Sequence, residues 1–294
     1  MSLIINHNLM AMSSARNLSS AYSALGTSVE RLSSGLRVNS AADDSAGLAI
    51  RELMRSDIGA LNQGVRNAND AISMIQTADG ALGVIDEKLI RMKELAEQAS
   101  TGTYTSTQRL IIDSEYQAMA SEITRIASAT DFNGIYLLNG NLSGNTHNGA
   151  TPTATGKLKV HFGPGNLSSE DYYYIQIGTA TASALGVGTS AGTPNSISTQ
   201  QLAQQSLNLL QSAIVSKDVI RANLGAMQNR LQNTISNLQI QSENLQSAES
   251  RISDVDVSTE MTEFVRQQIK SQAAVAMLAQ SNTLPRMAIQ LLGA

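Results

Sequence analysis

The side chains that could perform acid–base or metal chemistry in this 294-residue chain are few and scattered. The three histidines, His7, His147 and His161, are isolated, and no zinc-protease, nucleophile-elbow or phosphate-loop motif occurs. Asp43 and Asp44 are adjacent and could be an acid–base pair. A helix is expected just after them, where free amide groups and the helix dipole favour negative charge, so capping is the better interpretation. We therefore expect no catalytic site, no metal site, no cofactor and no enzymatic activity.

Composition argues against several other classes of protein. The formal net charge is −4 with 15% charged residues, so there is no basic patch for nucleic acid, and aromatic residues are only 3% of the chain. Cysteine is absent, which excludes disulfides. The N-terminus does not resemble a cleaved signal peptide, and no apolar run approaches the roughly 18 residues needed to cross a bilayer. We expect no membrane insertion. If the protein is exported, we expect the export machinery to recognise something other than a signal peptide.

Apolar residues recur at steps of three and four along most of the chain, which is the spacing of amphipathic helices. In the N-terminal half these stripes cover residues 4–32, 61–99 and 112–126, with breaks at Gly35 and Gly102. Helix is expected to return near Ser198, and a heptad run predicts a helix over about residues 224–255: Leu224, Leu231, Leu238, Leu245 and Ile252. A last helix steps by four from Met261 to Met277, and Pro285 either kinks it or marks its last turn.

The centre of the chain differs, because it is rich in glycine and contains two alternating segments, residues 157–162 and 172–177, that predict short strands. The predicted fold class is mainly α. Long antiparallel helices are expected to form a coiled-coil or bundle rod from paired N- and C-terminal segments, with a small β-hairpin region in the middle. The expected domains are residues 1–43 with 256–294 and residues 44–139 with 198–255. Residues 140–197 are expected to be a short insert that belongs to the second domain.

Both ends of the chain have helical periodicity but almost no charge. Arg16 is the only fully charged side chain in residues 1–29, and Arg286 is the only one in residues 271–294. Lone soluble helices need a charged face, so these surfaces are expected to be covered by other copies of the chain. The expected self-assembly residues are Leu18, Tyr22, Leu25, Val29 and Leu32 near the N-terminus, and Val265, Ile269, Met277, Leu278, Leu291 and Leu292 near the C-terminus.

Several collinear motifs resemble those of bacterial flagellin. In the N-terminal part they are residues 32–50 (LSSGLRVNSAADDSAGLAI), 66–70 (RNAND), 75–82 (IQTADGAL) and 130–134 (TDFNG). In the C-terminal part they are residues 250–256 (SRISDVD) and 278–282 (LAQSN). The resemblance covers about residues 1–140 and 198–294, and the short centre resembles a form with a reduced variable region. Ala71, where the family usually has glycine, is a small departure.

The resemblance implies a structural subunit that polymerises into the extracellular flagellar filament and serves motility. It implies that the terminal domain forms the inner filament core, and that the chain leaves the cell through the flagellar type III apparatus without a cleaved signal peptide. Implied partners are further copies of the chain, an export chaperone at residues 275–292, and the flagellar cap and junction proteins. A host innate immune receptor is a further implied partner, at Arg91, Leu95 and Glu115.

Three alternatives stay open at the level of sequence. A hook–filament junction protein shares flagellin-like termini but would adapt a filament rather than extend it. An exported coiled-coil effector that acts on membranes would need a basic amphipathic face, which the sequence lacks. An enzyme is the weakest alternative, because no set of reactive side chains converges.

Overall fold

A computed structural model describes residues 8–144, 156–168, 170–188 and 195–292, although the side chains of residues 284–286 and 288–292 fall outside the description. The elements in chain order are α1 (Leu9–Ser34), α2 (Ser45–Ser100), α3 (Ser106–Ala129), β1 (Asp131–Phe132), β2 (Ile135–Tyr136), β3 (Leu158–His161), β4 (Tyr172–Ile175), α4 (Gln200–Ser253) and α5 (Val257–Leu292). The chain divides into two compact units, residues 1–58 with 243–294 (unit 1) and residues 59–242 (unit 2). The predicted fold class, mainly α with a small β-hairpin region, is confirmed.

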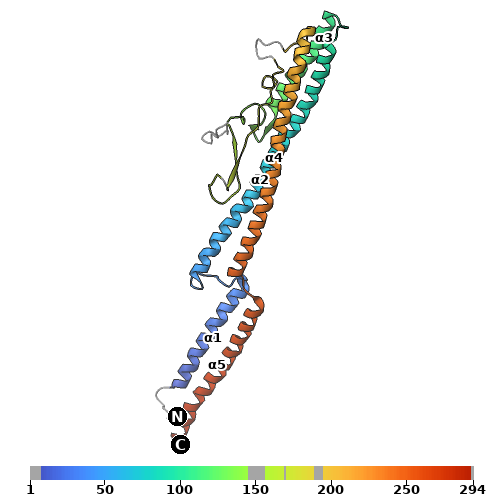
Figure 1. Cartoon of the computed structure of the whole chain (residues 1–294). Coiled ribbons are helices and arrows are strands. Elements are labelled where there is room, and N and C mark those ends of the chain that lie inside the picture. The colour runs from blue at the N-terminus through green and yellow to red at the C-terminus, as the bar shows by residue number, and fades with distance from the viewer. Residues whose placement is uncertain (1–7, 145–155, 169, 189–194, 293–294) are drawn as a thin grey trace. The chain divides into compact units, whose positions relative to one another are not determined.

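Unit 1 is built around α1 and α5, which lie side by side (Figure 1). The Asn8 side chain caps the start of α1 by accepting a hydrogen bond from the amide of Ala11. Gly35 ends α1 in the left-handed conformation, with φ of 73°, as the sequence predicted. Asp44 accepts a hydrogen bond from the amide of Gly47 at 2.9 Å, which confirms the capping interpretation for Asp44, whereas Asp43 bonds to the preceding loop. Helix α5 continues past Pro285 to Leu292, so that proline does not mark the last turn.

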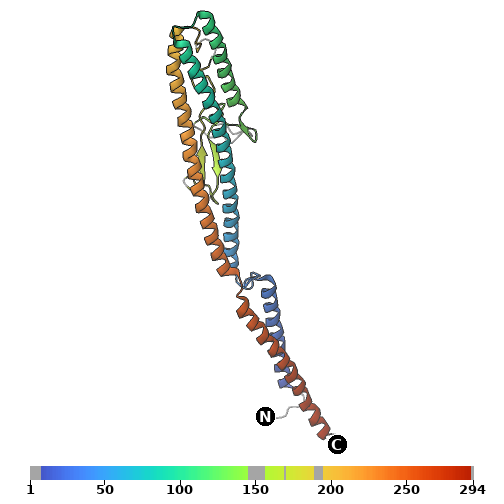
Figure 2. The same ribbon diagram turned by 90° about the vertical axis from the view of Figure 1, so that its right-hand side faces the viewer.

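Unit 2 contains three helical segments, from α2, α3 and α4, that run alongside one another (Figures 1 and 2). The capping box of Thr105 and Gln108 starts α3. The predicted stripe of α2 forms the centre of the core, and its members Leu82, Ile85, Leu89 and Met92 are fully buried. Helix α4 begins at Gln200, close to the predicted Ser198, and the first three leucines of its heptad run are buried. The hydrophobic periodicity therefore identifies the buried faces of this bundle correctly.

Ion pairs also join α2 to α4 across this core. The Lys217 Nζ atom lies 2.5 Å from Asp86 Oδ1 and 2.7 Å from Asp218 Oδ1, and the Lys217 side chain is only 2% exposed. One helical turn further along α4, Arg221 Nε lies 2.7 Å from Asp79 Oδ1. The later residue on α4, Arg221, pairs with the earlier residue on α2, Asp79. The two helices are therefore antiparallel.

Two antiparallel hairpins complete unit 2. In the first, β1 and β2 are joined by Asn133 and Gly134, whose φ values of 51° and 80° form the tight turn that favours an Asn-Gly pair. In the second, β3 pairs with β4, with Leu158 opposite Ile175 and His161 opposite Tyr172. Both predicted strands are confirmed, and each is shorter than its alternating segment. Val160 and Ile175 point into the core, so this hairpin is packed against the helices.

The second hairpin is held closely against α2 at Gly64. A Cβ atom at Gly64 would lie 1.9 Å from the carbonyl oxygen of Phe162, and the Asn67 side chain donates a hydrogen bond to the carbonyl of His161 at 2.8 Å. We expect Gly64→Ala to lower the free energy of unfolding by about 1–3 kcal/mol, because the backbone must move apart. Gly80→Ala is the matched control, since nothing lies within 4 Å of its added Cβ. Alanine there should stabilise the helix by about 1 kcal/mol. Urea unfolding of both variants, followed by circular dichroism, measures the contrast, and equal effects would contradict the close-packing explanation.

Candidate functional site

Where the structure describes the side chains considered for catalysis, they make local structural contacts. Within the described residues, no group of three or more His, Cys, Asp or Glu side chains is placed to hold a metal ion. The ring of His161 stacks against Tyr172 with 5.9 Å between centroids, whereas His7 and His147 lie outside the described residues. Asp43 closes a loop by accepting hydrogen bonds from Asn39 and Ser40. In the described part of the chain, no helix is long and apolar enough to cross a membrane.

The contact between α1 and α5 is made largely by small and polar side chains. Among the described side chains of these two helices, the buried ones are Ala21, Ser28, Glu260, Gln267, Ser271 and Ser281. Side chains of this size let two helices approach closely but bury little apolar area. The predicted residues Leu18, Leu25, Leu32 and Leu278 are half-buried beside this seam.

The other large apolar residues of the predicted set are exposed, and one of them, Met277, lines an open groove between α1 and α5 together with Ala21 and Ala24. Tyr22 and Val29 on α1 are 54% and 49% exposed, and Val265, Ile269 and Met277 on α5 are 44%, 61% and 55% exposed. Leu291 and Leu292 have side chains outside the description. Because a soluble monomer rarely leaves so many large apolar side chains in contact with water, this surface has the character of an interface. We call Tyr22, Val29, Val265, Ile269 and Met277 the outward apolar face.

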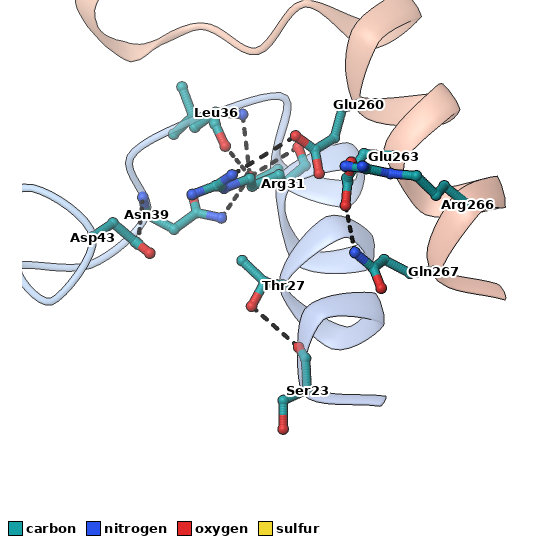
Figure 3. Close-up of polar contacts among 11 residues, drawn as sticks. Ser23, Thr27, Arg31, Leu36, Asn39, Asp43, Glu260, Glu263, Arg266 and Gln267 are labelled. Carbon is teal, nitrogen blue, oxygen red and sulfur yellow. Dashed lines mark hydrogen bonds and ion pairs between the residues drawn. The ribbon is translucent and has the colours of Figure 1, made fainter. Parts of the chain in front are cut away.

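Polar contacts tie α1 to α5 at both of its ends. Near its start, the Asn8 side chain donates a hydrogen bond to the carbonyl of Ser281 at 2.8 Å. Near its end, Arg31 lies 3.7 Å from Glu260, as Figure 3 shows. The Nε atom of Arg31 is buried without a hydrogen-bond partner, so this ion pair is incompletely satisfied. The described polar contacts between α1 and α5 are therefore few, which suits a pair that further contacts can complete.

A short stretch of backbone pairing, which we call the clasp, joins residues 35–37 to residues 252–255. The amide of Arg37 donates to the carbonyl of Ser253 at 2.6 Å, and the amide of Val255 donates to the carbonyl of Gly35 at 3.0 Å. The Arg37 guanidinium also donates to the carbonyl of Ile252 at 2.7 Å. Sequence reasoning missed the clasp, since it brings together segments more than 200 residues apart and has no local periodicity.

Carboxylates hold the loops beside the clasp. Hydrogen bonds from the amide and hydroxyl of Ser40 hold the pKa of Asp43 below its usual value. At the start of α5, Asp256 accepts hydrogen bonds from the hydroxyl of Thr259 at 2.8 Å and from the amide of Ser258 at 2.9 Å. These bonds, with that of the Thr259 hydroxyl the largest cause, lower the pKa of Asp256. Both carboxylates are therefore charged at neutral pH and stabilise the turns that they cap.

The three residues expected to form a receptor surface do not all lie on the surface of unit 2. Arg91 bonds to Glu115 at 2.8 Å and to Glu94 at 3.0 Å, and these side chains are exposed. The hydrogen bonds to Glu115 and Glu94 raise the pKa of Arg91. Leu95 is only 2% exposed, because it lies on the buried side of α2 with Met92 and Ala99. The structure corrects this part of the expectation, since Leu95 contributes to the core.

Comparison with known proteins shows that this chain is similar to characterised relatives over nearly its whole length. The family model described as the bacterial flagellin N-terminal helical region matches residues 5–143, and the corresponding C-terminal model matches residues 207–292. The chain is 40% identical to flagellin FlaB2 of Treponema pallidum and 41% identical to a flagellin of Halalkalibacterium halodurans. In both cases the match covers 99% of this chain and 100% of the relative. A putative flagellar hook-associated protein from Vibrio parahaemolyticus has a similar fold, with a TM-score of 0.55 and 15% identity over 72% of this chain and 100% of that structure.

Proposed function

The chain belongs to the bacterial flagellin family and is a structural subunit of the extracellular flagellar filament, and from this premise we propose that α1 and α5 supply its main assembly surface. The single observation that carries this proposal is the outward apolar face, with Ile269 61% exposed, on helices that carry little charge. Neighbouring subunits would remove these side chains from water, at about 25 cal/mol per Å² of apolar area. The contact between subunits is heterologous, which means that two different surfaces meet. An open helical polymer needs a symmetry operation that does not close into a ring.

We propose that the functional domains follow the helix breaks. The terminal domain would comprise residues 1–43 and 256–294 and form the inner filament core. The second domain would comprise residues 44–139 and 198–255 and include the insert of residues 140–197. The end of α1 at Ser34 and the break between Ser253 and Val257 support these boundaries.

Ordering of the terminal helices is proposed to accompany assembly. The α1–α5 seam buries mostly small side chains, which is little compensation for the conformational entropy of about 60 ordered residues. We expect amides of residues about 1–40 and 258–294 to exchange rapidly in the monomer and to become protected in filaments, while unit 2 is protected in both. Hydrogen exchange with mass spectrometry measures this difference. Strong protection of α1 and α5 in the monomer would contradict it.

Acid is expected to weaken assembly through the Asp256 cap. The pKa of Asp256 is lowered in the folded chain, so its stabilising contribution is present above the unfolded pKa of about 4 and is lost as pH falls through the folded value. The critical concentration for polymerisation should therefore rise between about pH 5 and pH 3. Asp256→Asn keeps a capping side chain that does not titrate, so its critical concentration should rise less. An identical rise in both proteins, measured by sedimentation, would show that other groups control the acid response.

Several partners are proposed from the family. An export chaperone would bind residues 275–292, where α5 exposes Val275 and Met277. Export would proceed through the flagellar type III apparatus, and cap and junction proteins would contact the assembled filament. A host innate receptor would contact Arg91 and Glu115, which are exposed, whereas Leu95 would support them from below. Receptor activation by Arg91→Ala and Glu115→Ala proteins, compared with Glu122→Ala on the same helix as Glu115, tests the last proposal.

A further inference from the structure

Unit 2 contains an open groove between its second hairpin and α4. The groove has a volume of about 620 Å³, and its apolar floor includes Ile175, Leu224 and Met227. Gly178 brings the chain close to α4 here, since a Cβ atom at this position would lie 2.9 Å from Ile220. The groove is thus a fixed feature of the hairpin–helix packing.

The walls of the groove are cationic. Lys157 and Arg230 line it together with the side-chain amides of Gln176 and Asn223, and no acidic residue does so. The Arg230 guanidinium lies 3.6 Å above the ring centroid of Tyr173 and forms no ion pair with a described carboxylate. Residues 219–242 of α4 contain only two charged side chains, Arg221 and Arg230, and Arg221 is already paired with Asp79. The Tyr173 ring therefore fixes Arg230 in position while its charge stays uncompensated.

The same chain carries a segment of opposite charge. Residues 243–263 contain six carboxylates and one cation, Arg251. Three of these carboxylates, which we call the acidic segment, lie on the last three turns of α4 or directly after it: Glu243, Glu249 and Asp254. A helix C-terminus disfavours negative charge. Glu249 accepts a hydrogen bond from the Ser253 hydroxyl, and Asp254 accepts one from the Ser250 hydroxyl, so these two carboxylates have local partners as well. Glu243 is exposed and forms no hydrogen bond or ion pair with the described residues.

We propose that the acidic segment of one copy docks on the cationic groove of a neighbouring copy. A second copy is the occupant to expect, because every filament subunit adjoins further copies and each copy carries both halves of the contact. The apolar floor would exclude water from the pairing and strengthen it. The contact would fix the direction and register of neighbours more than it adds affinity, which is the usual role of charge complementarity.

Reciprocal charge reversal tests this pairing. We expect the groove variant, Lys157→Glu with Arg230→Glu, to raise the critical concentration for seeded polymerisation about tenfold. The acid variant, Glu243→Lys with Glu249→Lys, should do the same. A 1:1 mixture of the two variants, and the protein with all four substitutions, should return to within about threefold of the parent, because each negative groove then meets a positive segment. Arg66→Glu is the matched control, since Arg66 is an exposed arginine of unit 2 that bonds only to Gln63 and lies outside the groove.

The other outcomes overturn the pairing. An effect of the groove variant without one of the acid variant would mean that another anion occupies the groove, and failure of the combined protein to recover would mean that the two surfaces do not meet. An equal effect of Arg66→Glu would mean that net charge alone is responsible. Circular dichroism of each variant establishes that unit 2 is folded. Because the parent protein polymerises in every one of these outcomes, failure of the pairing leaves the filament function intact.

Discussion

Ile269→Asp is expected to abolish filament formation while leaving unit 2 folded. Ile269 is 61% exposed in the described subunit, so an aspartate there meets water in the monomer and costs little. In the filament the same carboxylate would be moved into an apolar interface without a partner. The desolvation cost would exceed about 3 kcal/mol, which corresponds to more than about a hundredfold rise in critical concentration.

The control for this prediction is Ile269→Leu, which keeps the apolar character and the volume of the side chain and should polymerise within about threefold of the parent. Sedimentation and electron microscopy of seeded samples measure both proteins, and circular dichroism checks unit 2. Filaments of Ile269→Asp at the parent concentration would show that this face of α5 stays in contact with water after assembly. The outward apolar face would then need another explanation.

Periodicity in the sequence was enough to predict the helices and the buried stripe of unit 2. Leu82, Ile85 and Leu89 recur at helical spacing and are all fully buried, because a bundle core needs one apolar side from each helix. Turn chemistry was similarly informative, since Gly35 adopts the left-handed conformation that ends α1.

The same periodicity could not identify which partner covers each stripe. Within unit 1, Ala21 and Ser28 face α5, while Tyr22 and Val29, one position along, point to solvent. Rotating α1 about its axis by one residue position would exchange the buried side for the exposed one. The rotation that is adopted depends on how the small side chains fit across the seam. Leu95 was expected on the surface but is buried, for a related reason. Packing against neighbouring helices determines which side chains of α2 are buried.

Contacts between distant segments were the main omission. The clasp depends mainly on backbone atoms, which carry no sequence signal, and the one side chain that joins it, Arg37, bonds to a backbone carbonyl. The ion pairs between α2 and α4 left a trace that could have been used. Asp79 and Asp86 are seven residues apart on α2, and Lys217 and Arg221 are four apart on α4. Opposite charges on one face of each of two helices indicate that ion pairs can join them, but the spacing alone does not fix the relative direction of the helices.

Asp86→Ala is expected to lower the free energy of unfolding of unit 2 by about 2–3 kcal/mol, since it leaves the buried Lys217 ammonium with only one carboxylate, Asp218. Burial alone would lower the pKa of Lys217, but hydrogen bonds to Asp218 and Asp86 outweigh it and raise the pKa above its ordinary value. A raised pKa means that the stabilising contribution is fully present below the unfolded value of about 10.4 and is lost as pH rises through the folded one.

Lys217→Met gives the informative contrast, because it removes the buried charge and leaves Asp86 and Asp218 within reach of water at 28% and 59% exposure. Its unfolding free energy should stay within about 1 kcal/mol of the parent, as expected when a buried ion is replaced by an apolar side chain of similar length. Glu87→Ala, next to Asp86 and exposed, controls for the loss of a carboxylate from α2. If Lys217→Met proved as destabilising as Asp86→Ala in guanidinium unfolding, the pair would be contributing net stability. If instead both variants matched the parent, the contact would have no energetic role, and the register of α2 against α4 would depend on apolar packing alone.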